Sequence, residues 1–307
     1  MADAWLHRLA LTTAGTTLFL LFVGALVTSK GVGLAVPDWP TTFGHNMFLF
    51  PWAGMVGGVF YEHGHRLVAS GVGFLTLVLA VCLWLKETRA WVRWLGAAAL
   101  LLVTVQGVVG GLRVVLLAQD FAIIHAVLAQ AFFGLIVAMA LFTSRPWSEA
   151  RTVAPAAGRW TMFPWLCLAA ALLIYTQGLL GAVIRHTGTA VALHVLVALV
   201  VAVQIGMVVA KASRLGDEMP VFKTLSLALG LLLIVQLVLG TGSFAARFLA
   251  LGAAWQPGVI VAVTTAHVVT GAVMFALSVV LTLWAFRVLG AGRLPAMDGI
   301  ASERATA

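Results

Sequence analysis

The chain has 307 residues, of which 62% are hydrophobic and 9% charged, and its mean hydropathy is +1.08. Soluble globular domains carry about 25% charged residues, so this composition excludes a water-soluble enzyme and indicates a polytopic membrane protein. The net charge of +8 is scattered over segment ends, which argues against nucleic-acid binding. Cys82 and Cys167 both lie in apolar runs, where we expect small core or lipid-facing residues.

Polar, proline-containing and glycine-rich breaks separate eight apolar stretches, each long enough to cross a bilayer as a helix. They cover residues 9–29, 66–85, 94–117, 121–143, 162–184, 189–210, 222–246 and 259–286. The first is too long for the core of a signal peptide, so we expect it to be retained. The sequence therefore predicts an all-α integral membrane protein with eight transmembrane helices.

Lysine and arginine are divided unevenly between the two ends of these helices. Thirteen lie at the end that carries the chain termini and five at the other end. Because cytoplasmic loops retain positive charge, we expect both termini to be cytoplasmic, in the cell inner (plasma) membrane. The longest loop, residues 31–65, would then lie outside.

Four similar phrases recur at the outer ends of the odd-numbered helices, each running from small residues to a cation. They are GALVTSKG from Gly24, QGVVGGLR from Gln106, QGLLGAVIR from Gln177 and QLVLGTGSFAAR from Gln236. The repeat predicts two pseudo-symmetric four-helix bundles, residues 1–143 and 161–307, joined by a cytoplasmic linker at 144–160. Taken alone, the glycines are best explained by close helix packing.

Each even-numbered helix carries one histidine in its first third, at His65, His125, His194 and His267. Ionisable residues are costly in hydrocarbon and mark function, although a lone histidine could equally be a packing residue. Neutral imidazoles on facing helices of a bundle are a common way to hold haem iron. Four histidines at matching depth therefore predict two haems, one in each half.

Arginines supply a second indication. Arg66, Arg113, Arg185 and Arg247 all lie at helix boundaries on the side of the histidines. Haem carries two propionates, and guanidinium suits paired contacts with carboxylates, so we expect these arginines to help bind haem. The alternative is that they are interface residues extending toward the headgroups.

Tyr61-Glu62-His63-Gly64-His65-Arg66 is the most informative short string. Glu62, His65 and Arg66 share one helix face, whereas His63 points elsewhere. A carboxylate one turn from an iron ligand could accept a proton or stabilise a developing cation, which makes Glu62 the candidate catalytic residue. The competing interpretation is a Glu62–Arg66 ion pair that only anchors the helix.

The first outer loop contains Gly31-Val32-Gly33-Leu34-Ala35-Val36-Pro37-Asp38-Trp39-Pro40. Its glycine and proline content excludes a helix or a central strand. We expect an ordered lid in which Asp38 and Trp39 cap the site and exclude water. A generic interfacial tryptophan turn would look similar.

These features together resemble the haem A synthase family, membrane enzymes that convert haem O to haem A for cytochrome oxidase. The resemblance rests on the GLAVPDWP loop, the Glu62-x-x-His65-Arg66 motif and the three later histidines. It implies substrate haem on His65 and His125, haem b on His194 and His267, and Glu62 as the catalytic carboxylate. The reaction implied is oxidation of a ring methyl to a formyl group through a hydroxylated carbon. A haem O synthase (protohaem farnesyltransferase) would supply the substrate.

The chain departs from the family pattern at two places. Many bacterial members carry a cysteine pair in the first outer loop, where this chain has Val36 and Thr41 or Thr42, and arginine follows His65 but not the later histidines. Two other functions stay open: a di-haem b electron carrier, and a secondary transporter with histidine proton relays. The electron acceptor, the oxygen source and a homo-oligomeric state are not determined by the sequence.

Overall fold

The computed structural model describes residues 4–150, 162–214 and 219–290, and within these residues the regular structure is helical apart from one isolated bridge. Eight helices are long and apolar enough to cross a bilayer, which confirms the predicted all-α membrane fold. They are α1 (Ala4–Ser29), α2 (Gly57–Lys86), α3 (Ala90–Leu116), α4 (Gln119–Phe142), α6 (Phe163–Thr187), α7 (Val191–Arg214), α8 (Pro220–Phe248) and α9 (Pro257–Leu289).

These segments form helices because a chain in hydrocarbon must satisfy its backbone hydrogen bonds within itself. Proline stands in the first turn of α6, α8 and α9, where its missing N–H costs no helical bond. Gly188 ends α6 with a φ of +75°, a left-handed conformation that glycine adopts without steric cost. Residues 188–190 then lead the chain directly into α7.

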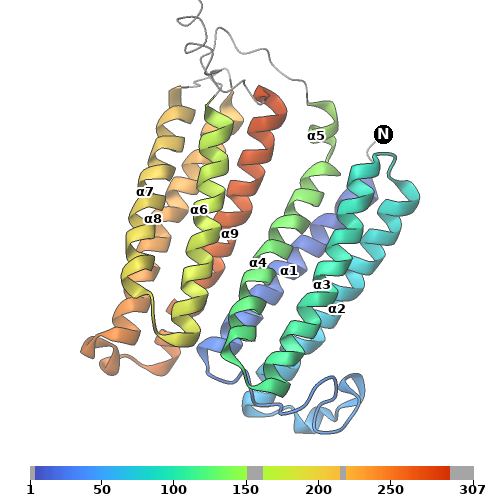
Figure 1. The fold of residues 1–307 in the computed structure, drawn as a ribbon, viewed down its shortest axis with the longest axis vertical. Coiled ribbons are helices and arrows are strands. Elements are labelled where there is room, and N and C mark those ends of the chain that lie inside the picture. Colours follow the sequence, from blue (N-terminus) through green and yellow to red (C-terminus); the bar gives the residue numbers. More distant parts are fainter. Residues whose placement is uncertain (1–3, 151–161, 215–218, 291–307) are drawn as a thin grey trace, which may run out of the picture.

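Figure 1 shows α1–α4 grouped beside α6–α9. In the first group each helix contacts the next and α1 contacts α4; in the second, each contacts the next and α6 contacts α9. The two groups meet where α4 contacts α6 and α9, and where α1 contacts α9. The domain boundaries at 143 and 161 stay predictions, because part of the linker lies outside the described residues.

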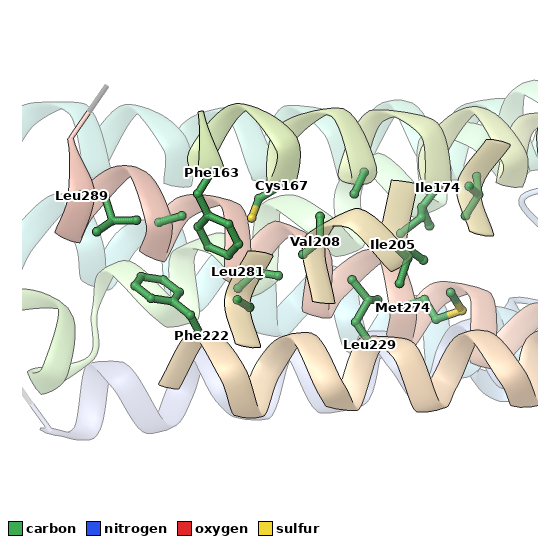
Figure 2. Packing of buried hydrophobic residues seen from close by; sticks show 14 residues of the cluster. Phe163, Cys167, Ile174, Ile205, Val208, Phe222, Leu229, Met274, Leu281 and Leu289 are labelled. Atoms are coloured by element: carbon green, nitrogen blue, oxygen red, sulfur yellow. The ribbon is translucent and has the colours of Figure 1, made fainter. Parts of the chain in front are cut away.

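The apolar core fills the end of each group that is remote from the histidines. In α6–α9 it includes Phe163, Cys167 and Phe222, shown in Figure 2. In α1–α4 it includes Leu79 and Phe132. Cys167 is buried, Cys82 is partly buried and both are free, as expected. Dense packing at one end holds the helices in register, so the polar residues at the other end are placed by a rigid frame.

The loop between α1 and α2 is shorter than predicted, because α2 begins at Gly57 and not at residue 66. The polar string around Glu62 lowers the hydropathy of these first turns, but its side chains are bonded to the loop. Residues 30–56, the 30–56 loop, contain two short 3-10 helices, η1 (Met47–Leu49) and η2 (Trp52–Gly54). We call the end of the helices beside it the loop end.

Two short helices lie in other connections. The linker opens with α5 (Arg145–Glu149), and Ser144 caps it by accepting a hydrogen bond from the Trp147 N–H. Between α8 and α9, η5 (Ala250–Ala254) makes a much shorter connection than the 30–56 loop. The loop ends of the two groups are therefore covered differently.

Candidate functional site

Each of the four histidines lies against one glycine of the preceding long helix. A Cβ atom on that glycine would come within 2.9 to 3.6 Å of the histidine Cε1. The pairs are Gly24 with His65, Gly110 with His125, Gly181 with His194 and Gly240 with His267. The glycines of the repeated phrases thus have a further role beside helix packing, since they leave room for imidazole rings. In the pairs of Gly24, Gly110 and Gly240 the Cε1–Nδ1 edge of the ring faces the glycine, whereas only Cε1 of His194 lies within 4 Å of the position beside Gly181.

The histidines lie in two pairs. His65 lies near His125, and His267 lies near His194. Nδ1 of His65, His194 and His267 is buried without a hydrogen-bond partner. In the part of the chain that the structure describes, no three His, Cys, Asp or Glu side chains gather as a candidate metal site. Paired imidazoles on facing helices fit the axial ligands of a haem better than the ligands of a bare metal ion.

Glu62 is buried on α2, with 4% of the residue exposed, and both of its carboxylate oxygens are engaged. Oε2 accepts a hydrogen bond from the Val36 N–H at 2.9 Å. Oε1 accepts one from Arg66 Nη2 at 2.8 Å, an ion pair one turn along the helix. A buried carboxylate needs such partners, because an unpaired charge in a dry site is strongly disfavoured.

Arg66 holds the 30–56 loop against α2. Its Nη1 donates to the carbonyls of Asp38 and Thr41 at 2.7 and 3.1 Å, and its Nη2 donates to the carbonyl of Val36 at 3.1 Å as well as to Glu62. Both amino groups are therefore occupied by protein oxygens. The predicted propionate contact of Arg66 stays a prediction, and the ion pair of the competing interpretation is present.

The 30–56 loop is ordered by its own polar groups. The Asp38 carboxylate accepts hydrogen bonds from the Thr41 hydroxyl and from the N–H groups of Phe43 and Gly44, at 2.5, 2.7 and 2.8 Å. Burial alone would raise the pKa of Asp38, but these hydrogen bonds outweigh it and the pKa lies below its usual value. Asp38 thus shapes the loop through hydrogen bonds within it.

Trp39 connects the loop to α3. Its indole ring lies directly on Gly111, where any Cβ atom would overlap the ring. Two consecutive glycines of one phrase therefore leave room for two different rings. Gly110 contacts the ring of His125, and Gly111 contacts the ring of Trp39. The loop covers this end of the α1–α4 group, as a lid would.

Arg113 is the predicted haem-binding arginine that lies near the carboxylate and near both histidines of the α1–α4 group. It is half-buried on α3, and its Nη2 lies 2.6 Å from the position of a Cβ atom on Gly33. It interacts electrostatically with Glu62, His65 and His125. Among the four arginines it is the one best positioned to meet an anionic group bound beside these residues.

Arg185 and Arg247 link helices in this structure. Arg185 Nη2, on α6, donates to the Ala25 carbonyl at 2.7 Å and to the Ser29 hydroxyl at 2.6 Å, both on α1. Arg247 Nη1 donates to the Arg185 carbonyl at 3.1 Å. Sequence reasoning could not find these contacts, because they depend on which helices of the two groups meet. Binding of propionates by these two residues stays a prediction.

Two kinds of residue near the histidines were given no role by the sequence pattern. His63 is buried, with its Nδ1 3.0 Å from the Thr42 hydroxyl and its ring packed on Phe50. It faces the loop, away from the His65 pair. Gln106 and Gln177 donate to the backbone carbonyls of His125 and His194. The signal for the glutamines was present, since three of the four repeated phrases begin with one.

Two relatives and a family model match this chain. A protein named "Heme A synthase" from Shouchella clausii (strain KSM-K16) is 27% identical over 194 residues, which is 61% of this chain and 61% of the relative. A second protein of that name, from Geobacillus kaustophilus (strain HTA426), is 26% identical over 194 residues, which is 58% of this chain and 56% of the relative. The chain thus matches about three fifths of the length of these curated relatives.

The family model described as cytochrome oxidase assembly protein, COX15-CtaA, matches residues 7–196. This range contains the 30–56 loop, Glu62 and the histidines up to His194, and it ends before α9. The family resemblance recognised from the loop and the Glu62-x-x-His65-Arg66 motif is thereby confirmed. Because the match covers more than half of the sequence, the chain belongs to the COX15-CtaA family of cytochrome oxidase assembly proteins.

Proposed function

We propose that this protein is a haem A synthase, an oxidoreductase that converts haem O to haem A. The reaction oxidises one ring methyl of the substrate to a formyl group through a hydroxylated carbon. Both relatives carry the name "Heme A synthase". The observation that carries the proposal is Glu62, a buried carboxylate on the same helix face as His65, under an ordered loop.

The histidine pairs divide the haems between the two halves. His65 and His125 would hold the substrate haem, with Arg113 at its propionates, and His194 and His267 would hold a resident haem b. The room left by the four glycines and the buried Nδ1 atoms support this fit. Haem b, when bound, would supply a one-electron redox centre close to the substrate half.

Glu62 can act in two ways. As a counter-charge to a cationic intermediate it needs no movement, because the carboxylate already sits in place with Arg66 and Val36 as partners. As a base it would accept a proton on a lone pair that these two donors do not use, since an ionised carboxylate has about four acceptor positions. Val36 and Arg66 would hold the carboxylate in position in both cases.

The loop also keeps the site dry. Trp39 lies on α3, Arg66 holds three loop carbonyls, and Glu62 bonds the Val36 N–H. Exclusion of water strengthens the interaction between a carboxylate and a developing positive charge. A lid with these attachments suits oxidation of a ring carbon in a protected site.

Cell location and partners follow from the same proposal. The eight apolar helices suit a multi-pass membrane protein, and the thirteen-to-five charge division favours the plasma membrane with cytoplasmic termini. The lipid bilayer and a haem O synthase are the expected partners, the second as supplier of the substrate. An electron acceptor is required because the methyl group is oxidised, and a homo-oligomer is compatible with this arrangement.

Extraction of the haems tests the proposal. The protein is purified in detergent from cells that make haem O, its reduced-minus-oxidised spectrum is recorded, and the extracted haems are separated by chromatography. We expect haem b together with haem O, haem A or the hydroxylated intermediate. Haem b alone after haem O has been supplied would contradict synthase activity, and absence of haem would contradict the ligand assignment.

The second candidate is a di-haem b electron carrier that leaves the porphyrin unchanged. It is favoured by one observation, that the His194–His267 pair has the same glycine contacts as the His65–His125 pair without any carboxylate three residues before either histidine. The chromatography above separates the two functions, because a carrier would contain haem b with no formyl or hydroxylated haem.

A further inference from the structure

Three glutamines stand one helical turn before the glycines that contact the histidines. The pairs are Gln106 with Gly110, Gln177 with Gly181 and Gln236 with Gly240. In an α-helix the carbonyl of residue i bonds the N–H of residue i+4, and the Cβ of residue i+4 lies beside that carbonyl. Glycine at i+4 therefore exposes the glutamine carbonyl to a second donor.

The histidine ring uses this opening. Nδ1 of His125 lies 3.2 Å from the Gln106 carbonyl oxygen. The carbonyls of Gln177 and Gln236 lie near the rings of His194 and His267, but Nδ1 of these two rings has no hydrogen-bond partner. An iron-binding histidine commonly donates its other ring N–H to a carbonyl, which fixes the tautomer and leaves Nε2 free to bind the metal.

The side-chain amides of the glutamines hold the histidine backbone. Nε2 of Gln106 donates to the His125 carbonyl at 2.7 Å, and Nε2 of Gln177 donates to the His194 carbonyl at 2.9 Å. Gln236 reaches α9 as well, with its Nε2 3.2 Å from the position of a Cβ atom on Gly271, one turn after His267. Each of these glutamines therefore contacts the histidine-bearing helix beside the ligand.

These glutamines are costly to bury. Oε1 of all three is buried without a hydrogen-bond partner. A buried polar atom left without a hydrogen-bond partner destabilises the folded protein, so packing alone gives no reason for glutamine at three equivalent positions. The first phrase differs, because Leu20 stands one turn before Gly24. His65 has the glycine but no amide beside it.

Resting on the proposed function, we propose that Gln106, Gln177 and Gln236 are positioning residues for the haem ligands, and that Leu20 leaves His65 the adjustable ligand. The substrate half then has one fixed and one adjustable histidine, which suits a haem that must enter and leave. The other half has two fixed histidines, which suits a resident haem. The difference between the halves thus lies in the residue one helical turn before each glycine.

A matched pair of variants tests the positioning role. Gln177→Leu removes the amide that reaches His194 from α6. Gln204→Leu removes a similar bond between the same two helices, since Gln204 Nε2 on α7 donates to the Leu166 carbonyl at 2.8 Å, about 15 Å along the helix from His194. Loss of packing or of one interhelical hydrogen bond affects both variants, whereas loss of ligand position affects only the first.

The readout is carbon monoxide binding to the reduced, haem-loaded protein, because a haem held by two firm histidines excludes this ligand. We expect Gln177→Leu to raise the CO-binding fraction several-fold and to change the low-spin electron paramagnetic resonance signal, and Gln204→Leu to change neither. Equal behaviour of the two variants would overturn the positioning role.

The reciprocal variant is Leu20→Gln, examined in a His267→Ala background so that only the substrate half contributes. We expect the CO-binding fraction of this half to fall, because His65 gains the amide it lacks, and an unchanged fraction would contradict the role of Leu20. If the unmodified chain binds haem but forms no haem A, the proposed enzyme activity would be overturned and the positioning roles would stay intact. A chain that binds no haem would overturn both.

Discussion

The α1–α4 and α6–α9 groups share one histidine framework and differ in what surrounds it. In both, two histidines on facing helices lie against glycines of the preceding helices. In the first group, His65 is preceded three residues earlier by Glu62 and followed by Arg66, and the 30–56 loop covers them. At the matching positions around His194, on the second helix of the other group, the chain has Val191 and Val195.

Under the proposed function, this difference separates haem binding from haem oxidation. Both groups have a pair of histidines with room for their rings, which under the proposed function would hold a haem. A buried carboxylate with a covering loop occurs beside only one pair among the described residues. Under the proposed function, the α6–α9 group would therefore serve as an internal reference that binds haem without the groups needed for chemistry.

Replacement of Glu62 by glutamine removes this difference and has the largest expected effect. We expect conversion of haem O to fall by about 10²–10⁴-fold, the usual contribution of a positioned acid or base, with haem content preserved. The ratio of haem A to haem O in extracts measures it. Glu87→Gln is the control, because Glu87 pairs with Arg89 at 2.8 Å at the end remote from the loop. Equal loss of conversion in both variants would refute a catalytic role for Glu62.

His267→Ala tests whether the two haem sites are separable. Since His267 belongs only to the α6–α9 pair, the variant is expected to lose the haem of that group and to keep substrate haem bound at least in part. Haem content per chain, measured after extraction, reports the loss. Complete loss of both haems would show that the two sites form one unit.

Substitution of Arg66 tests how the 30–56 loop, which only the α1–α4 group has, is held against α2. Arg66→Leu leaves Glu62 buried without its ion-pair partner, which costs about 3–5 kcal/mol, and releases three loop carbonyls. Arg66→Lys keeps the charge but offers fewer donors in a different geometry, so we expect a smaller loss. Thermal unfolding and protease cleavage within residues 30–56 measure the two variants. Identical losses would favour a packing role for the side chain.

Replacement of these glycines by alanine has the smallest expected effect. The effect should be larger at Gly110 than at Gly181. A Cβ atom on Gly110 would lie 2.9 Å from His125, whereas one on Gly181 would lie 3.6 Å from His194, an ordinary contact. We expect Gly110→Ala to displace its histidine at a cost of about 1–3 kcal/mol and Gly181→Ala to be tolerated. The absorption spectrum of the bound haems distinguishes them. A larger disturbance from Gly181→Ala would contradict the imidazole contacts.

The fold was largely predictable because hydropathy and the need for internal backbone hydrogen bonds act on each span separately. All eight spans were found from apolar runs, and the start of α2 was misplaced. The polar residues from Glu62 to Arg66 lower the local hydropathy, yet they lie in the helix because the loop supplies their partners. Hydropathy averaged over a sequence window cannot predict hydrogen-bond partners that come from elsewhere in the chain.

The site was predictable where the residue pattern repeats and not where it depends on contacts between the two groups. The histidines, the glycines and Glu62 stand out in the sequence. The partners of Arg66 and Arg185 do not, because a guanidinium at a helix end can meet a propionate or a carbonyl equally well. Their present acceptors, on the loop and on α1, follow only from the packed structure.

Ser29, the last residue of α1, receives polar contacts from helices made much later in synthesis. Its hydroxyl lies 2.6 Å from Arg185 Nη2 and 3.0 Å from the hydroxyls of both Thr264 and Thr265. A growing chain inserts α1 first, so the loop end of this helix waits for α6 and α9 before its polar groups are satisfied. Because Gly24, which receives His65, lies only about one turn away, the first half of the molecule acquires its final form when the last helix has entered the membrane.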